Sequence, residues 1–123
     1  MSKEKTTKEK GDNGEEEAAA FLRSIGYTIV EQKWRYTRYE IDIIAENETH
    51  IVFVEVKKRY SNVYGEPWEA VKAGKRKRIC LGADAYIKEK DHNKEPRFDI
   101  ISIIQEGNTS TLLHIEEAFY PMA

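Results

Sequence analysis

The chain has 123 residues, 40% hydrophobic and 34% charged, with a formal net charge of −2, which suits one compact domain with a single core and a well-solvated surface. No stretch approaches the roughly 20 apolar residues of a membrane span, and the N-terminus has no apolar segment typical of a secretory signal. Cys80 is the only cysteine, so an internal disulfide is excluded and a cytoplasmic location without membrane contact is expected.

The N-terminal part of the chain predicts a tail followed by a helix. Residues 1–13 are polar and charged without periodicity, which predicts a flexible tail, and the domain is expected to span residues 14–120. A helix is predicted from Gly14 to Ile25, because apolar residues recur at helical spacing and Gly26 follows in a position typical of helix ends. Glu15, in the first turn, either stabilises the helix dipole or points inward towards the sheet.

A strand is predicted over residues 27–33, which are rich in residues that favour β-structure. The next six residues, 34–39, interleave aromatic and basic side chains. Such a segment can stack on bases and contact phosphates, with Arg35 as a candidate contact. Alternatively, Trp34 and Tyr36 simply cover the edge of the core, and both interpretations are kept.

Residues 40–57 predict a β-hairpin, because two arms rich in Ile, Val and Phe flank a short polar connector. Four charged residues interrupt these apolar arms, where charge is costly unless the groups meet one another or a metal ion. They are Glu40, Asp42, Glu55 and Lys57.

The register of this hairpin decides whether the four charges meet. If Ala45 pairs with His50, Asp42 lies opposite Phe53, and all four charged side chains share one face because side chains alternate with period two. Asp42 and Glu55 are then diagonal neighbours, about 7–8 Å apart at the backbone, close enough for one cation to bridge their carboxylates.

Two carboxylates on a rigid sheet suit Mg²⁺, which prefers oxygen ligands and takes only one or two protein carboxylates. Asp42, Glu55 and the Val56 carbonyl are expected to hold the ion. Lys57 would lie on the same face, where it can orient a water that the ion activates, and the implied reaction is phosphodiester hydrolysis. The alternative is a surface salt bridge between Glu55 and Lys57.

The second half of the chain predicts a loop over residues 58–66, a long helix from Pro67 to Glu89, and strands over residues 97–105 and 111–115. Lys75 lies in line with the apolar stripe of the helix, so it must reach solvent or an anionic partner, such as a phosphate site. The order of helices and strands indicates an α/β fold in which helices flank a mixed sheet.

Basic residues are concentrated between residues 57 and 78. Such an excess is typical of a nucleic-acid-binding surface, although a solvated helix face has the same composition. Together with the aromatic-basic segment, it provides the candidate phosphate contacts, namely Arg35, Lys58, Arg59, Lys72, Lys75 and Arg76.

The motifs of the chain resemble those of the YraN-like family of bacterial proteins (UPF0102 type), which is grouped with the PD-(D/E)XK nuclease superfamily, near the archaeal Holliday junction resolvases. The resemblance extends over residues 11–120. The matching motifs are Gly11-x₃-Glu15-x₂-Ala18-x₃-Leu22-x₃-Gly26-Tyr27, Trp34-Arg35, Glu40-Ile41-Asp42, Phe53-Val54-Glu55-Val56-Lys57-x-Arg59, Gly65, Val71-x₃-Lys75, Arg97-Phe98-Asp99 and Ala118-Phe119.

The resemblance implies a restriction-endonuclease-like fold in which Asp42 and Glu55 are the two catalytic acids and Lys57 is the catalytic lysine. It also implies that Glu15 matches a helix glutamate which resolvase-like members add to the metal site. Two further motif positions correspond to Arg59 and Lys75, whose implied role is phosphate contact.

The implied activity is that of a Mg²⁺- or Mn²⁺-dependent DNA endonuclease, acting on duplex or branched, Holliday-junction-like DNA, with a homodimer expected by analogy. One alternative is a nucleic-acid-binding protein on a nuclease fold without efficient cleavage. Another is an interaction protein whose ion cluster only locks the hairpin. Two departures from the family pattern are Lys33, where many members have Asn, and Tyr39, where many have Gly. Tyr39 would narrow the approach to the site.

Overall fold

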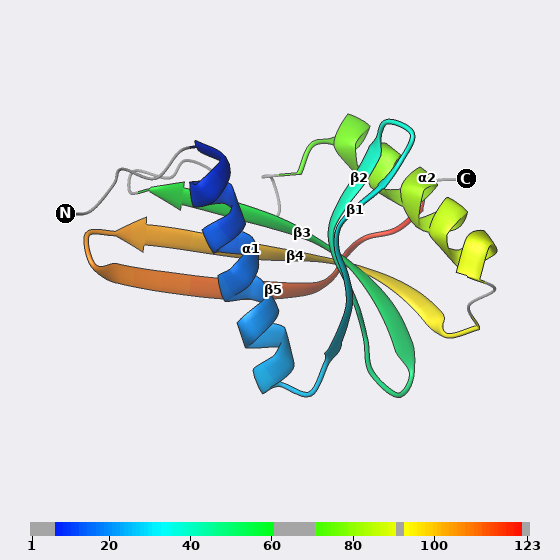
Figure 1. The fold of residues 1–123 in the computed structure, drawn as a ribbon, viewed down its shortest axis with the longest axis horizontal. Coiled ribbons are helices and arrows are strands. Elements are labelled where there is room, and N and C mark those ends of the chain that lie inside the picture. Colours follow the sequence, from blue (N-terminus) through cyan, green and yellow to red (C-terminus); the bar gives the residue numbers. More distant parts are fainter. Residues whose placement is uncertain (1–6, 61–70, 91–92, 122–123) are drawn as a thin grey trace.

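The sheet and helices are those of a computed structural model, which describes residues 7–60, 71–90 and 93–121 (Figure 1). Along the chain the elements follow in the order α1, β1, β2, β3, α2, β4 and β5. The helices are α1 (Thr7–Ser24) and α2 (Ala73–Lys90), and the strands are β1 (Thr28–Tyr36), β2 (Tyr39–Glu46), β3 (His50–Tyr60), β4 (Glu95–Glu106) and β5 (Thr109–Phe119).

The five strands form one mixed sheet in the order β1-β2-β3-β4-β5. The central pair, β3 and β4, is parallel, and the other neighbouring pairs are antiparallel. Because parallel neighbours cannot be joined by a tight turn, the chain passes through α2 between β3 and β4. A single domain with helices flanking a mixed sheet confirms the predicted α/β, restriction-endonuclease-like fold.

The two helices cover opposite faces of the sheet, because β3 presents apolar side chains on both sides. Phe53 belongs to a buried cluster with Tyr86 of α2, whereas its neighbour Val54 belongs to a second cluster with Leu22 of α1. Residues 51–54 are fully buried, as expected for a strand sandwiched between two layers of helix. The apolar centre of β3 therefore anchors the strand between the two helices, and the polar part of the strand begins at Glu55.

Several element boundaries differ from those predicted. Helix α1 begins at Thr7 rather than Gly14, so part of the segment predicted as a tail is helical, while residues 1–6 lie outside the described residues. The first strand continues to Tyr36, where Trp34 packs edge-on against Tyr86 and stacks on Tyr36. These aromatic contacts support the interpretation that this segment covers the core.

In the second half of the chain, α2 is described from Ala73, so the predicted helix start at Pro67 lies outside the described residues, as does most of the predicted loop. The final strands are longer than predicted, and the turn at residues 107–108 between them is confirmed.

The predicted register of the β2–β3 hairpin is wrong by two residues. Ala45 pairs with Val52 rather than His50. The turn keeps its length but lies one residue later, where the Asn47 side chain accepts hydrogen bonds from the backbone N–H groups of Thr49 and His50, at 3.0 and 2.8 Å. A shift of two residues is one full period of a strand, so the prediction that the charged residues share a face survives the error.

The two outermost strands are both irregular. The pairing of β1 with β2 shifts register between Ile29 and Glu31, and Lys33 has a left-handed backbone with φ 52°. The pairing of β5 with β4 shifts between Phe98 and Ile100, and Glu117 has φ 50°. Non-glycine residues rarely adopt positive φ, so these positions mark bends that the surrounding contacts enforce.

A buried ionic network explains the bend in β5. The Asp99 carboxylate is fully buried and accepts hydrogen bonds from the Arg97 guanidinium at 2.9 and 2.8 Å, from His114 Nε2 at 2.7 Å, and from the Glu117 N–H at 3.2 Å. Arg97 also donates to the Tyr27 hydroxyl at 2.6 Å. Burial would raise the pKa of Asp99, but the hydrogen bonds from His114 and Arg97 hold it below its ordinary value.

Asp99→Ala is expected to lower the free energy of unfolding by about 3–5 kcal/mol, because it leaves the buried Arg97 charge only the exposed Glu116 carboxylate, at 3.6 Å, as an ionic partner among the described residues. A carboxyl whose pKa is lowered by folding stabilises the fold above its ordinary pKa of 3.8 and loses that contribution as the pH falls. Urea unfolding between pH 3 and pH 7 should therefore show less acid destabilisation in the variant. Asp84→Ala is the control, since Asp84 is exposed and pairs only with Lys88 in the described structure. Equal losses in both variants would contradict this role.

Candidate active site

The candidate site lies where β2 separates from β3. Their described pairing ends at Ile43 and Val54, and continuing the register places Asp42 opposite Glu55. Beyond this point the N–H of Val56 is not paired with the β2 backbone and instead donates to Asp42 Oδ2 at 2.9 Å. The carboxylate thus satisfies a backbone donor that the diverging strand releases, and this holds Asp42 over β3.

The bend at Lys33 lies directly across the β1–β2 ladder from Asp42, between the pairs Gln32–Ile43 and Trp34–Ile41. Beyond it, Ile41 packs in the cluster beneath α2. Asn adopts the left-handed conformation more readily than Lys, so the Lys that departs from the expected pattern here stands at a strained position. The sequence indicated Lys33 only as a departure from the family pattern. Its position opposite Asp42, at a bend of the strand, was not predicted.

Four carboxylates crowd at this point of the sheet. Glu55 is only 2% exposed, and Glu15 of α1 experiences the charges of Asp42, Glu40 and Glu55. Burial, reinforced by these acids, raises the pKa of Glu15 to about 7. Burial and the charge of Asp42 likewise raise the pKa of Glu55 to about 7, and burial raises the pKa of Asp42. Carboxyl groups shifted in this way are typical of sites that bind a cation or transfer protons.

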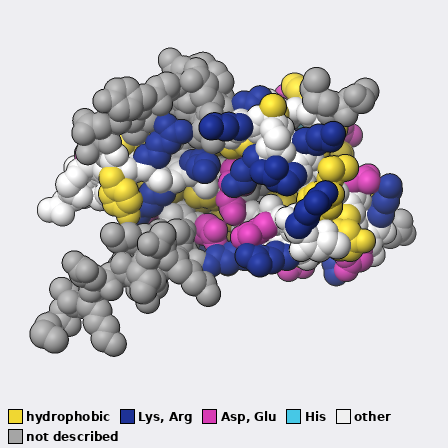
Figure 2. All heavy atoms as spheres, turned by 90° about the horizontal axis from the view of Figure 1, so that it is seen from above, with side chains coloured by type: hydrophobic (Ala, Val, Ile, Leu, Met, Phe, Trp, Pro, Cys, Tyr) yellow, Lys and Arg dark blue, Asp and Glu magenta, His cyan; other side chains and the backbone are white. Residues whose placement is uncertain are grey.

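Three of the described lysines oppose this acidic charge. Lys33 Nζ lies 3.9 Å from Glu15 Oε2, and the other two approach Glu55. Lys75 of α2 places its ammonium 2.5 Å from Glu55 Oε1, so the anionic partner that its position in the helix requires is this carboxylate. Lys57, half-buried two residues after Glu55, also lowers the pKa of Glu55. Figure 2 shows the resulting surface, where acidic side chains gather in one patch with Lys and Arg side chains on both sides. The structure therefore brings Asp42, Glu55, Lys57 and Glu15 close to one another, and their roles in a site stay a prediction.

The other candidate phosphate contacts are more dispersed. Lys58 points to the opposite face, where it pairs with Glu17 of α1 at 2.8 Å. Arg35 pairs with Glu40 at 3.0 Å on the hairpin. Arg76 donates to the Val71 carbonyl at 2.7 Å and lies over the Phe119 ring, which are contacts within the fold. Of the remaining two, Lys72 is exposed just before α2 and Arg59 is half-buried in β3.

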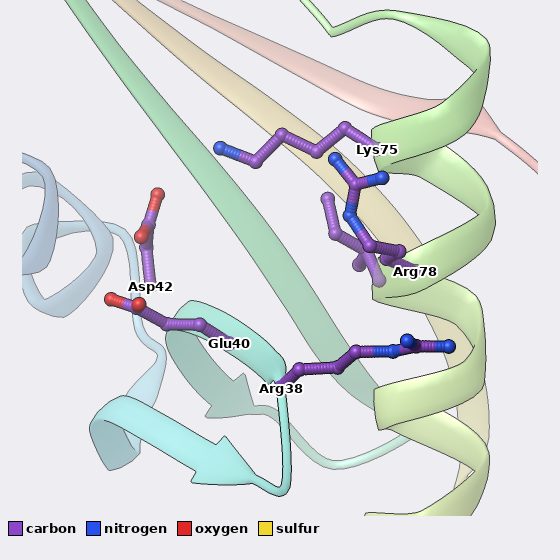
Figure 3. Close-up of a pocket in the computed structure, with 6 residues that line it drawn as sticks. Arg38, Glu40, Asp42, Lys75 and Arg78 are labelled. Atoms are coloured by element: carbon purple, nitrogen blue, oxygen red, sulfur yellow. The ribbon is translucent and has the colours of Figure 1, made fainter.

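A pocket of about 240 Å³ opens beside the carboxylates, between the β1–β2 hairpin and the start of α2 (Figure 3). Two of its lining residues, Arg38 and Arg78, were not among the predicted contacts. Arg78 lies one helical turn after Lys75, so helical spacing could have identified it. For Arg38, no pattern in the sequence indicates that the hairpin turn lies against α2. The lining residues are Arg38, Glu40, Asp42, Lys75, Arg78 and Ile79.

The donors present fit a hard divalent cation in one specific way. Among the described residues, no group of three or more Asp, Glu, His or Cys side chains is arranged to hold a metal ion. Asp42 and Glu55, however, lie close enough for the charge of Asp42 to raise the pKa of Glu55, and Mg²⁺ is commonly held by one or two carboxylates while it keeps several waters. Val56 contributes its N–H to Asp42 rather than directly to such a site, so its carbonyl as a ligand stays a prediction.

Comparisons with known proteins place the chain in a family. The sequence profile described as "Uncharacterised protein family UPF0102" matches residues 14–103. The chain belongs to this family. A UPF0102 protein of Bacteroides thetaiotaomicron is 43% identical over 92% of this chain and 93% of its own length. UPF0102 proteins of Phocaeicola vulgatus and Clostridium acetobutylicum are 42% and 43% identical, over 90% and 91% of this chain and 92% and 94% of their own lengths.

These UPF0102 relatives match nearly the whole domain, including the strands and helices that carry the acidic patch. The predicted family is thus confirmed. In the part of the chain that the structure describes, no helix is long and apolar enough to cross a membrane.

Without divalent ions, this UPF0102 protein is expected to lose stability as the pH rises from about 5 to 8. A carboxyl whose pKa is raised by folding contributes its stability below the ordinary value of 4.5 and loses it as the pH passes about 7, because ionisation then crowds the acidic patch. Glu15→Gln should raise the melting temperature at pH 8 by a few degrees and have less effect at pH 5. Thermal unfolding across this range tests the expectation.

The control for this experiment is Glu48→Gln, in the exposed turn between β2 and β3. It removes the same charge far from the acidic patch and should leave the slope unchanged. If Glu15→Gln leaves the stability difference between pH 5 and pH 8 as large as in the unmodified protein, the proximity of Glu15 to the other acids has no energetic consequence.

Proposed function

We propose that this UPF0102 protein is a Mg²⁺-dependent DNA endonuclease, with Mn²⁺ as a substitute ion, that hydrolyses phosphodiester bonds and includes branched DNA among its substrates. The observation that carries the proposal is the buried Glu55, whose pKa the neighbouring Asp42 raises, with Lys57 on the same strand face. Ionised carboxylates in such proximity are stable only beside compensating positive charge.

Each residue has a distinct role in the proposed reaction. Asp42 and Glu55 would hold the ion, and the Val56 N–H keeps Asp42 in position. A bound Mg²⁺ would activate a water and offset charge on the attacked phosphate. Lys57 would orient the attacking water or accept its proton, and Glu15 lies near enough to adjust the charge of the site.

Lys75 has a different role when no metal is present. Its ammonium lies against Glu55 Oε1 and compensates the charge that a divalent ion would otherwise neutralise. With the charge of Glu55 neutralised by an ion, Lys75 would be free to contact the phosphate of the substrate. The same side chain would thus have one contact in the free protein and another in the substrate-bound protein.

A second candidate function is a nucleic-acid-binding protein that uses the nuclease fold without efficient cleavage. Basic groups bordering the acidic patch, among them Lys75 and Arg78, favour contact with phosphates under either function. Binding alone gives no reason for buried carboxylates that repel phosphate, which is why cleavage is preferred. The proposal also includes a homodimer, by analogy with junction resolvases, which measurement of the molecular mass in solution tests directly.

Mg²⁺ or Mn²⁺ is expected to raise the melting temperature of the protein, and Asp42→Asn should abolish that shift because it removes one ligand charge. Lys57→Ala should retain DNA binding and cut at least about tenfold more slowly. The substrates are duplex, single-stranded and four-way-junction DNA, each with and without the divalent ion. Asp84→Asn, on the exposed face of α2, is the matched control. Cleavage that persists in Asp42→Asn would exclude this site as the catalytic centre.

Lys75→Met is expected to tighten Mg²⁺ binding by at least about fivefold, because a unit positive charge within about 4 Å of an ion opposes its binding by about 1 kcal/mol or more. Titration calorimetry with MgCl₂ measures the change without relying on activity. Lys77→Met, on the exposed side of the same helix, is the control. Weaker Mg²⁺ binding in Lys75→Met would show that Lys75 organises the ligands rather than substituting for the ion.

A further inference from the structure

The pocket beside the acidic patch separates its charges into two walls. Figure 3 shows the carboxylates of Glu40 and Asp42 on one side and the side chains of Arg38 and Arg78 on the other, with Lys75 extending from α2 towards Asp42. An anion alone would be repelled by the first wall, and a cation alone by the second. The ligand that fits both is an anionic group bound next to a cation.

The acidic wall already has compensating charge, whereas the basic wall does not. Lys75 pairs with Glu55, and Arg35 pairs with Glu40. Neither Arg38 nor Arg78 forms an ion pair with another described residue. Guanidinium groups present donors in a planar fork that matches two oxygens of a phosphate group, so two of them lining one pocket favour phosphate in particular.

The structure positions both arginines before any ligand arrives. Arg38 lies over the ring of Tyr39 at 5.8 Å, and Tyr39 is itself held against α2, where a side-chain carbon added to Gly82 would meet its Cβ at 3.1 Å. Arg78 lies along the first turn of α2 beside Gly74, where a side-chain carbon added to Gly74 would be 3.7 Å from the guanidinium, an ordinary contact distance. Tyr39 therefore supports an arginine of the pocket, which gives this departure from the family pattern a physical role.

We propose that Arg38 and Arg78 together bind one phosphate group of a nucleic acid strand, the phosphate next to the one that is cleaved. The inference rests on the proposed endonuclease function, because the carboxylate wall must hold the cation beside the scissile phosphate. A pocket of about 240 Å³ accommodates a single phosphate with part of its sugar.

DNA binding without divalent ions tests this phosphate site separately from cleavage. Fluorescence anisotropy with a labelled four-way junction over a range of KCl concentrations gives both affinity and its salt dependence. Arg38→Gln and Arg78→Gln should each weaken binding about five- to tenfold and reduce the slope of log K against log salt by about one, as for the loss of one phosphate contact. Arg78→Lys should recover only part of the affinity, because it restores charge without the fork.

The double variant distinguishes a shared phosphate from two separate ones. If one phosphate serves both arginines, the slope in Arg38→Gln/Arg78→Gln falls by about one, no more than in either single variant. A fall of about two would overturn the shared site. Arg23→Gln, in the last turn of α1 and more than two turns beyond Glu15, is the matched control and should bind as the unmodified protein does.

A chemical substitution in the DNA locates the phosphate. Junctions carrying one uncharged methylphosphonate at a time are compared in the unmodified protein and in Arg78→Gln. The substitution beside the cut should weaken binding of the unmodified protein and have no further effect on the variant. If both arginine variants bind and cut normally while Asp42→Asn is inactive, the phosphate site is wrong and the endonuclease proposal stands. If the unmodified protein binds no DNA at low salt, both fail.

Discussion

The hydrogen bond from the Val56 N–H to Asp42 is the interaction on which the site depends. A sheet normally satisfies that N–H with the next carbonyl of the neighbouring strand, but here the neighbour bends away at the position opposite Lys33. The carboxylate replaces the missing carbonyl, so the same event that ends the ladder fixes an acid beside Glu55. The hydrogen bond that satisfies the backbone N–H is therefore the same one that fixes the geometry of the site.

Placing Asp42 beside Glu55 has an electrostatic cost, which nearby lysines partly offset. Three acids approach one another in a half-buried setting, and the ordinary response of a protein is to keep some of them protonated near neutral pH. Lys75 supplies one compensating charge from α2, and Lys57 a weaker one from the strand itself. The fold thus tolerates the acids without a bound ion.

The shared face of Asp42, Glu55 and Lys57 could be predicted from the sequence because period-two alternation survives a register error of two residues. The exact pairing could not, since it depends on how the Asn47 side chain closes the turn. For Lys75, the sequence predicted only that the side chain needs an anionic partner, and it did not identify this partner as Glu55.

Other features depend on how elements meet in space. Predicting the position of Arg38 against α2 requires knowing how far the hairpin twists. Predicting the pairing of Lys58 with Glu17 requires knowing which face of β3 packs against α1. A run of basic residues such as 57–59 distributes its members over both faces of the strand, so composition alone assigns too many of them to one surface.

The bends at Lys33 and Glu117 have a consequence for the behaviour of the protein at high concentration. Both lie on the outermost strands of the sheet, where unpaired N–H and C=O groups are available to any other extended chain. In β1 the left-handed residue and the shifted register interrupt this row near its middle, which hinders pairing with another sheet at that edge. In β5 the bend lies near the end of the strand, and residues 109–115 keep a regular register, so of the two edges β5 offers the longer regular row.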